Sequence, residues 1–202
     1  MSYAHYTYTF SVDPSAAPSA FASTADVQIL LDAVWAEAEA SDGPELRLVH
    51  GSSRKGWVLE RTKSLTEALS LTGLGFLHAG GNEELEAENY LRKPTILRAT
   101  ERDEAAAQLE RALHHLTTHP EFAGDLADVL RNEDAVAAFR REYGAGQASI
   151  DLNDVPQGFE GDCGEYLAAY LTSVKRILRE ARLNNRVVIH VCDLEGESPR
   201  RG

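Results

Sequence analysis

The sequence contains little cysteine and no long apolar run. Its 202 residues include two cysteines, Cys163 and Cys192, which are too few for a disulfide framework. A single bridge between them stays open, although two reduced thiols are the simpler interpretation. A run of about eighteen apolar residues is missing, as are the basic and apolar regions of a secretory signal. We therefore expect a cytoplasmic protein without a membrane-spanning helix and without a membrane partner.

Signatures of cofactor and metal sites are also missing. Gly73 and Gly75 lack the next glycine of a dinucleotide-binding loop, and Gly80-Gly81 lacks the lysine and hydroxyl residue of a phosphate-binding loop. His115 and His119 have the spacing of one helix face, but no metalloprotease motif or carboxylate-rich calcium loop accompanies them. We interpret both histidines as surface residues. The sequence predicts neither a cofactor nor a metal site.

The residues that are present suffice for one packed domain. Apolar residues make up 43% of the chain and charged residues 26%, which is close to ordinary globular proteins. A chain of this length corresponds to one domain with one core. We therefore expect a single domain over residues 1–202, in which residues 195–202 form a frayed tail.

The formal charge of −12 is concentrated in the middle of the chain. Nineteen acids and eight bases lie between Glu83 and Glu165, whereas the remaining residues are almost balanced. Such a field repels nucleic acid and attracts basic proteins, although the same charge could serve solubility alone. The basic cluster from Lys175 to Arg186 lacks interleaved aromatic residues, and we expect some of its members to pair with the acidic middle. A basic protein partner is expected and nucleic acid is not.

The first third of the chain shows clear periodicity. Residues 6–12 alternate between apolar and hydroxyl side chains, which is typical of a half-buried strand. Ser23 and Asp26 predict a capping box at the start of a helix that ends near residues 42–44. Two short strands, at residues 45–50 and 56–61, are then predicted to form a hairpin.

Weaker signals predict further elements in the middle of the chain. These are a helix opened by a capping box of Ser64 and Glu67, a helical turn at 83–91, a strand at 95–99, a helix at 100–118, short helices at 122–130 and 136–143, and a brief strand near Ile150. The strongest signal is an apolar stripe over residues 163–183, which predicts the longest helix. It is followed by Asn184-Asn185 as a C-cap and by a core strand at 187–191.

The irregular order of these elements predicts an α+β fold. A strict alternation of strands and helices would favour a doubly wound parallel sheet, and the sequence does not show it. We expect a mixed, mostly antiparallel sheet of four to six strands packed against several helices. The helices should cover mainly one face, and the long C-terminal helix should lead into the final core strand.

One cysteine has the sequence context of a catalytic thiol. Cys163 lies at the predicted N-terminus of the long helix, where the helix dipole favours a thiolate. His190 on the following strand could act as its base, with Asp193 behind it. Over a handful of residues, Asp162-Cys163 resembles the start of the catalytic helix in NlpC-type peptidases. Against this hypothesis, Asp162 and Glu165 would raise the pKa of the thiol, and one strand alone follows the helix.

The sequence favours a non-catalytic role. The first hypothesis is an acidic protein-binding module, such as an inhibitor or a toxin-neutralising protein of the bacterial immunity type, which blocks a basic partner by charge and shape. The residues predicted to bind the partner are Glu83, Glu84, Glu86, Glu88, Asp125, Asp128, Asp151, Asp154, Glu160 and Asp162. The alternatives are a small cysteine-dependent hydrolase or acyltransferase using Cys163 and His190, and a structural or regulatory subunit that oligomerises through an exposed edge of the first strand.

Overall fold

The computed structural model describes residues 4–41, 43, 45–54, 57–79, 92–118, 148–152 and 164–192. The strands are β1 Ala4–Val12, β2 Leu48–Arg54, β3 Arg92–Leu97, β4 Ser149–Asp151 and β5 Val187–Cys192. The helices are α1 Thr24–Glu39, α2 Trp57–Ala68, the 3₁₀ turn η1 Thr72–Leu74, α3 Phe76–Ala79, α4 Ala99–Thr118 and α8 Gly164–Leu183. The helices and the turn predicted between residues 83 and 91 and between 122 and 143 lie outside the described residues.

The described strands form one open sheet in the order β3-β5-β1-β2-β4. Every neighbouring pair is antiparallel except β2 and β4, which run parallel. The mixed, mostly antiparallel α+β fold predicted from the sequence is therefore confirmed. Because β1 is the middle strand, hydrogen-bonded on both sides, the prediction that its edge is exposed for oligomerisation was wrong. The edges of the described sheet are β3 and β4 instead.

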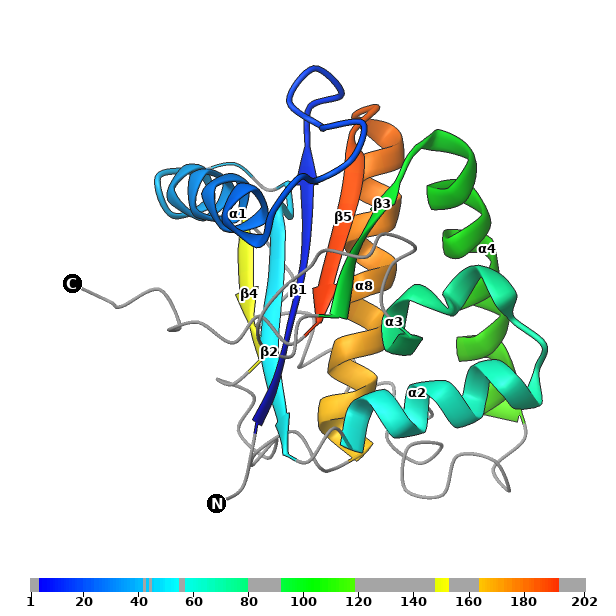
Figure 1. Cartoon of the computed structure of the whole chain (residues 1–202). Coiled ribbons are helices and arrows are strands. Elements are labelled where there is room, and N and C mark those ends of the chain that lie inside the picture. Colours follow the sequence, from blue (N-terminus) through cyan, green and yellow to red (C-terminus); the bar gives the residue numbers. More distant parts are fainter. Residues whose placement is uncertain are drawn as a thin grey trace.

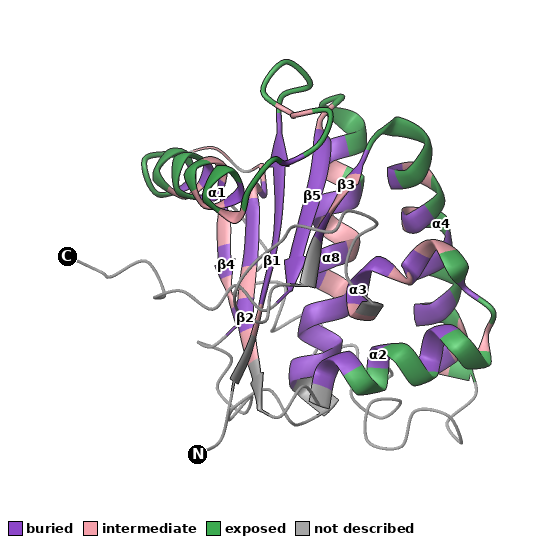
Figure 2. Ribbon diagram, viewed as in Figure 1, coloured by how far each residue is buried: buried purple, intermediate pink, exposed green. Residues whose placement is uncertain are grey.

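Helices cover both faces of the sheet (Figure 1). On one face α8 and α4 pack side by side with α2 and α3, and this layer contains the larger apolar core. On the other face α1 is the one described helix, and it covers a second core that includes Phe10, Leu31 and Ile189. Most of the described helices thus lie on one face of the sheet, as expected. Figure 2 shows that α1 is nevertheless buried on its sheet side and exposed on the other.

The C-terminal helix and strand form as predicted. The apolar stripe of α8 is buried along its length, and all six residues of β5 are buried. Asn185 adopts a left-handed conformation with φ of 52°, which asparagine tolerates better than most residues. The Arg186 N–H then donates to the Ala181 carbonyl at 2.7 Å. This cap ends α8 and turns the chain directly into β5.

The first capping box is confirmed and the second is not. The Ser23 hydroxyl accepts from the Asp26 N–H, and the Asp26 carboxylate accepts from the Ser23 N–H at 2.9 Å. By contrast, α2 already begins at Trp57, so Ser64 lies inside the helix and donates to the Glu60 carbonyl. The prediction of a strand at residues 56–61 was therefore wrong, and with it the hairpin.

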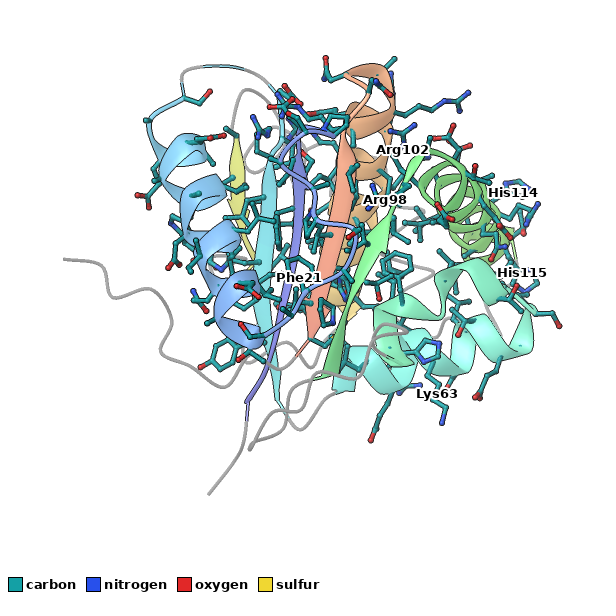
Figure 3. All side chains as sticks on the ribbon, turned by 45° about the horizontal axis from the view of Figure 1, so that its top comes forward. Phe21, Lys63, Arg98, Arg102, His114 and His115 are labelled. Carbon is teal, nitrogen blue, oxygen red and sulfur yellow. The ribbon has the colours of Figure 1, made fainter. Side chains whose placement is uncertain are left out.

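A buried arginine joins α4 to the C-terminal end of α8. The Arg102 side chain donates to the Ala181 and Arg186 carbonyls at 3.3 and 2.6 Å, and its Nε lies 2.9 Å from the Asp103 carboxylate. Figure 3 shows Arg102 between these two helix ends, with His114 and His115 near the opposite end of α4. The guanidinium gives the Ala181 carbonyl a second donor beside the Arg186 N–H and pairs with the Arg186 carbonyl just beyond the helix end.

Candidate functional site

Asp151 is the one predicted binding carboxylate that lies among the described residues. The other nine, namely Glu83, Glu84, Glu86, Glu88, Asp125, Asp128, Asp154, Glu160 and Asp162, lie outside them. Asp151 belongs to the three-residue edge strand β4 and pairs in register with His50 of β2. Its Oδ2 lies 3.4 Å from the His50 Nε2. The gathering of the acidic middle into one surface therefore stays a prediction.

His50 lies in a half-open cluster between the sheet and α1. Its ring is 4.3 Å from the ring of Trp35, measured between centroids, and stacks with Tyr8 at 6.2 Å. The side chains of His50 and Asp151 are 12% and 18% exposed. The Trp35 indole N–H donates to the Glu39 carboxylate at 2.8 Å. Two aromatic rings, an imidazole and carboxylates thus meet where solvent can reach them.

The hydroxyl of Tyr8 reports the electrostatics of this cluster. Burial, and then the nearby Tyr6, Asp151 and Asp32, raise the pKa of Tyr8 from 10.0 to about 12. All of these causes oppose a negative charge on the phenol, because desolvation and neighbouring anions both destabilise a phenolate. Tyr8 therefore remains a neutral hydrogen-bonding group over the physiological pH range. Burial and the neighbouring carboxylates thus both disfavour an anion at this position.

His190, the predicted base, lies on the opposite face of the sheet beneath α8. Its Nδ1 is 2.8 Å from the Thr9 hydroxyl of β1, and its Nε2 is 3.1 Å from the Cys192 thiol of β5. Phe76 of α3 contacts the ring edge-on. Either neutral tautomer gives the ring one donor and one acceptor for these two partners. Both ring nitrogens are thus already engaged inside the fold.

Burial determines the protonation state of His190. The side chain is 1% exposed, and desolvation lowers the pKa of its imidazole from 6.5 to about 3. An imidazole that burial holds neutral does not form the thiolate–imidazolium pair of cysteine hydrolases. Cys163 and Asp193, the predicted nucleophile and third residue, lie outside the described residues. The Cys192 thiol is reduced and contacts the His190 ring.

The sheet face under α8 contains further buried hydroxyl groups. Thr7, Thr9 and Ser11 of β1 are each at most 3% exposed, although the sequence places them opposite the apolar face of that strand. The Ser11, Tyr170 and Ser173 hydroxyls make no hydrogen bond within the described part of the chain. Burial raises the pKa of Tyr170 well above 10.0. These hydroxyl groups are polar but uncharged, and they are closed to solvent.

Some basic residues of the last helix pair with the acidic middle of the chain, as predicted. The Lys175 ammonium lies 3.2 Å from the Glu110 carboxylate, and Arg182 lies 3.8 Å from Asp103. Arg176 pairs with Glu180 on the same helix at 2.6 Å. Two acidic residues of the middle segment therefore compensate α8. The pairing reduces the negative field on this side of the described structure.

Sequence reasoning did not single out α1 as a surface of interest. Its sixteen residues contain four acids, Asp26, Asp32, Glu37 and Glu39, and no base. Ile29 is 68% exposed in their midst. The signal was visible as an acidic helix with an apolar residue on its polar side, but the larger surplus in the middle of the chain outweighed it.

Comparison with known proteins adds no relative. The chain matches no protein-family model, no curated protein and no solved structure. Within the described residues, no three metal-ligating side chains come together, and no helix has the length and apolar content to cross a membrane. The candidate sites must therefore be judged on their own geometry.

Proposed function

We propose that this protein is an acidic binding module of the cytoplasm, which neutralises a basic protein partner as an inhibitor or immunity-type protein does. The observation that supports the proposal is that basic and acidic side chains have different kinds of partner. Most of the described basic side chains are engaged in ion pairs within the chain. The acids of α1, in contrast, are held mainly by uncharged donors.

The physical consequence is a net negative field that the fold does not cancel. The formal net charge of the chain is −12. Because the bases pair with acids of the same chain, the unpaired acidic side chains contribute their negative charge to the surface. Such a field accelerates association with cationic proteins and discriminates against anionic ones. Blocking a basic active cleft needs complementary charge and shape but no catalytic group. The closed and neutral surroundings of His190 agree with a module of this kind.

No specific observation supports the cysteine-hydrolase alternative. His190 is buried and engaged by Thr9 and Cys192, so it lacks a free nitrogen for an incoming substrate. Oligomerisation through an edge of β1 is excluded, because β1 is the central strand and pairs with a neighbour on both sides. The binding module is therefore the function that the described geometry supports best.

The test uses the products of the genes adjacent to that of this protein. Each product is purified, and binding is measured by calorimetry at about 50 and about 300 mM salt, because screening shortens the reach of surface charge. We expect one basic product to bind in a 1:1 complex that weakens at least about tenfold at the higher salt and to lose its own activity. Salt-independent binding, or binding without inhibition, would contradict the proposal, as would no binding by any of these products.

A further inference from the structure

The outward face of α1 has an apolar centre bordered by acids on both sides. Ile29 is 68% exposed, and Asp26 and Asp32 lie three residues before and after it. At helical spacing these two positions fall on opposite sides of Ile29. The exposed small residues that surround the isoleucine are Ala25, Ala33 and Ala36. The result is a shallow apolar strip along the helix, with carboxylates along its two borders.

The border carboxylates are fixed in position and mostly keep their charge. Asp32 accepts from the Gln28 amide at 2.7 Å, and Glu39 accepts from the Trp35 indole at 2.8 Å. Asp26 accepts from the Ser23 N–H at 2.9 Å. Among the residues that the structure describes, Glu37 is the one member of this group with a basic partner, Arg47 at 3.2 Å. Three oriented anions with neutral donors cost little entropy to engage, because their rotamers are already restricted.

We propose that this face of α1 is the docking surface for an amphipathic helix of the basic partner, an inference that rests on the proposed function. The partner helix would place an apolar stripe on Ile29 and Arg or Lys residues against the two acidic borders. Small residues beside Ile29 permit close approach of two helices. At about 1.5 Å per residue, the sixteen residues of α1 offer a length of about 24 Å.

Charge complementarity selects this occupant over the alternatives. A second copy of the chain would bring carboxylates against carboxylates, because α1 has no base, and like charges repel across an interface. Nucleic acid and anionic lipid are repelled for the same reason. One helix pair buries less than the roughly 800 Å² per partner of a standard interface, so the isolated contact should bind in the micromolar range.

The probe is a synthetic peptide of about eighteen residues, made of leucine and lysine with leucine at helical spacing, labelled for fluorescence anisotropy. A peptide of equal composition without that spacing is its control. The full chain is compared as Ile29→Asp and as Leu183→Asp, because Leu183 is 72% exposed at the end of α8. Both variants add the same charge to an exposed apolar position, and circular dichroism verifies their folding.

We expect the striped peptide to bind more tightly than its control and to lose about tenfold in affinity with Ile29→Asp but not with Leu183→Asp. Two double variants then test whether the position of the lost charge matters. Asp32→Asn/Glu39→Gln removes two carboxylates from α1, and Glu60→Gln/Glu67→Gln removes two from α2. The α1 pair should weaken binding and flatten its salt dependence more than the α2 pair. Equal effects within both pairs would overturn the docking surface, as would equal binding of the two peptides, while leaving the proposed function standing. If the adjacent gene products also fail to bind, the proposed function falls with it.

Discussion

The two faces of the sheet each hold a histidine, and the surroundings of the two rings differ in kind. His190 faces α8, is 1% exposed and has a hydroxyl and a thiol as partners. His50 faces α1, has a side chain that is 12% exposed, and lies between aromatic rings and the Asp151 carboxylate. The first environment accepts only uncharged partners, whereas the second accepts charge because water and a carboxylate are within reach.

This difference assigns different roles to the two faces. The α8 face is the larger core, and within it the Thr9 hydroxyl, the His190 ring and the Cys192 thiol form a buried hydrogen-bonded chain. Among the described elements, the α1 face has the smaller core and a single covering helix, whose charged residues are all acidic. The proposed recognition of a cationic partner is therefore assigned to the α1 side, and the hydrogen-bonded chain through His190 is assigned to stability. Three experiments can separate these assignments.

The largest expected effect is the response of His190 to acid. Its pKa is about 6.5 unfolded and about 3 folded, so between these values the unfolded chain binds a proton that the native protein does not. Stability that is present above pH 6.5 should be lost as the pH falls toward 3, on the order of 5 kcal/mol in total and roughly half of that by pH 4.5. Urea unfolding at pH 7, 5.5 and 4.5 measures this loss.

His190→Gln is the control for that measurement. Glutamine offers a donor and an acceptor but does not titrate in this range. The variant should be less stable at neutral pH and should show a flatter decline between pH 6.5 and 4.5, because the proton uptake of residue 190 on unfolding is then absent. Parallel declines in the variant and the natural protein would show that the imidazole is not held neutral by burial.

The next effect separates hydroxyl groups that have a partner from those without one. Thr9→Val keeps the shape of the side chain but removes the partner of the His190 Nδ1, which should cost about 1–3 kcal/mol of unfolding free energy. Ser11, two residues along the same face of β1, makes no side-chain hydrogen bond among the described residues. Ser11→Ala should change stability by less than about 0.5 kcal/mol. Equal losses in the two variants would refute a special role for the Thr9–His190 contact.

The sequence predicted best where one face of an element is continuously apolar. The α8 stripe and the β5 run determine their own structure, because any other arrangement would expose them. Thr7, Thr9 and Ser11 illustrate the limit. Alternation reveals that two faces differ, but a hydroxyl face turned to water and one buried under a helix have the same pattern. The polar chain to His190 depends on contacts between residues about 180 positions apart, which periodicity does not show.

The false hairpin has a related cause. Gly51-Ser52-Ser53 has the composition of a turn, yet these residues continue β2 alongside β1. A Cβ atom at position 51 would collide with the Tyr166 hydroxyl and would come within 2.9 Å of the Leu152 Cβ. Glycine is there because α8 and the residue after β4 approach the strand closely. From the sequence alone, a glycine required by packing cannot be distinguished from one required by a turn.

The smallest effect tests the half-open histidine. Asp151→Asn removes the charge beside His50 and should lower the unfolding free energy by about 1 kcal/mol or less, since both side chains are partly exposed to water. The same change removes one of the causes that raise the pKa of Tyr8 from 10.0 to about 12, but burial, the largest cause, remains. The ultraviolet titration of Tyr8, assigned by its absence in Tyr8→Phe, should therefore move down in pH while staying above 10. An unchanged titration would mean that the Asp151 charge does not reach Tyr8. The α1 side would then not differ, in the effect of a carboxylate on a buried side chain, from the uncharged surroundings of His190.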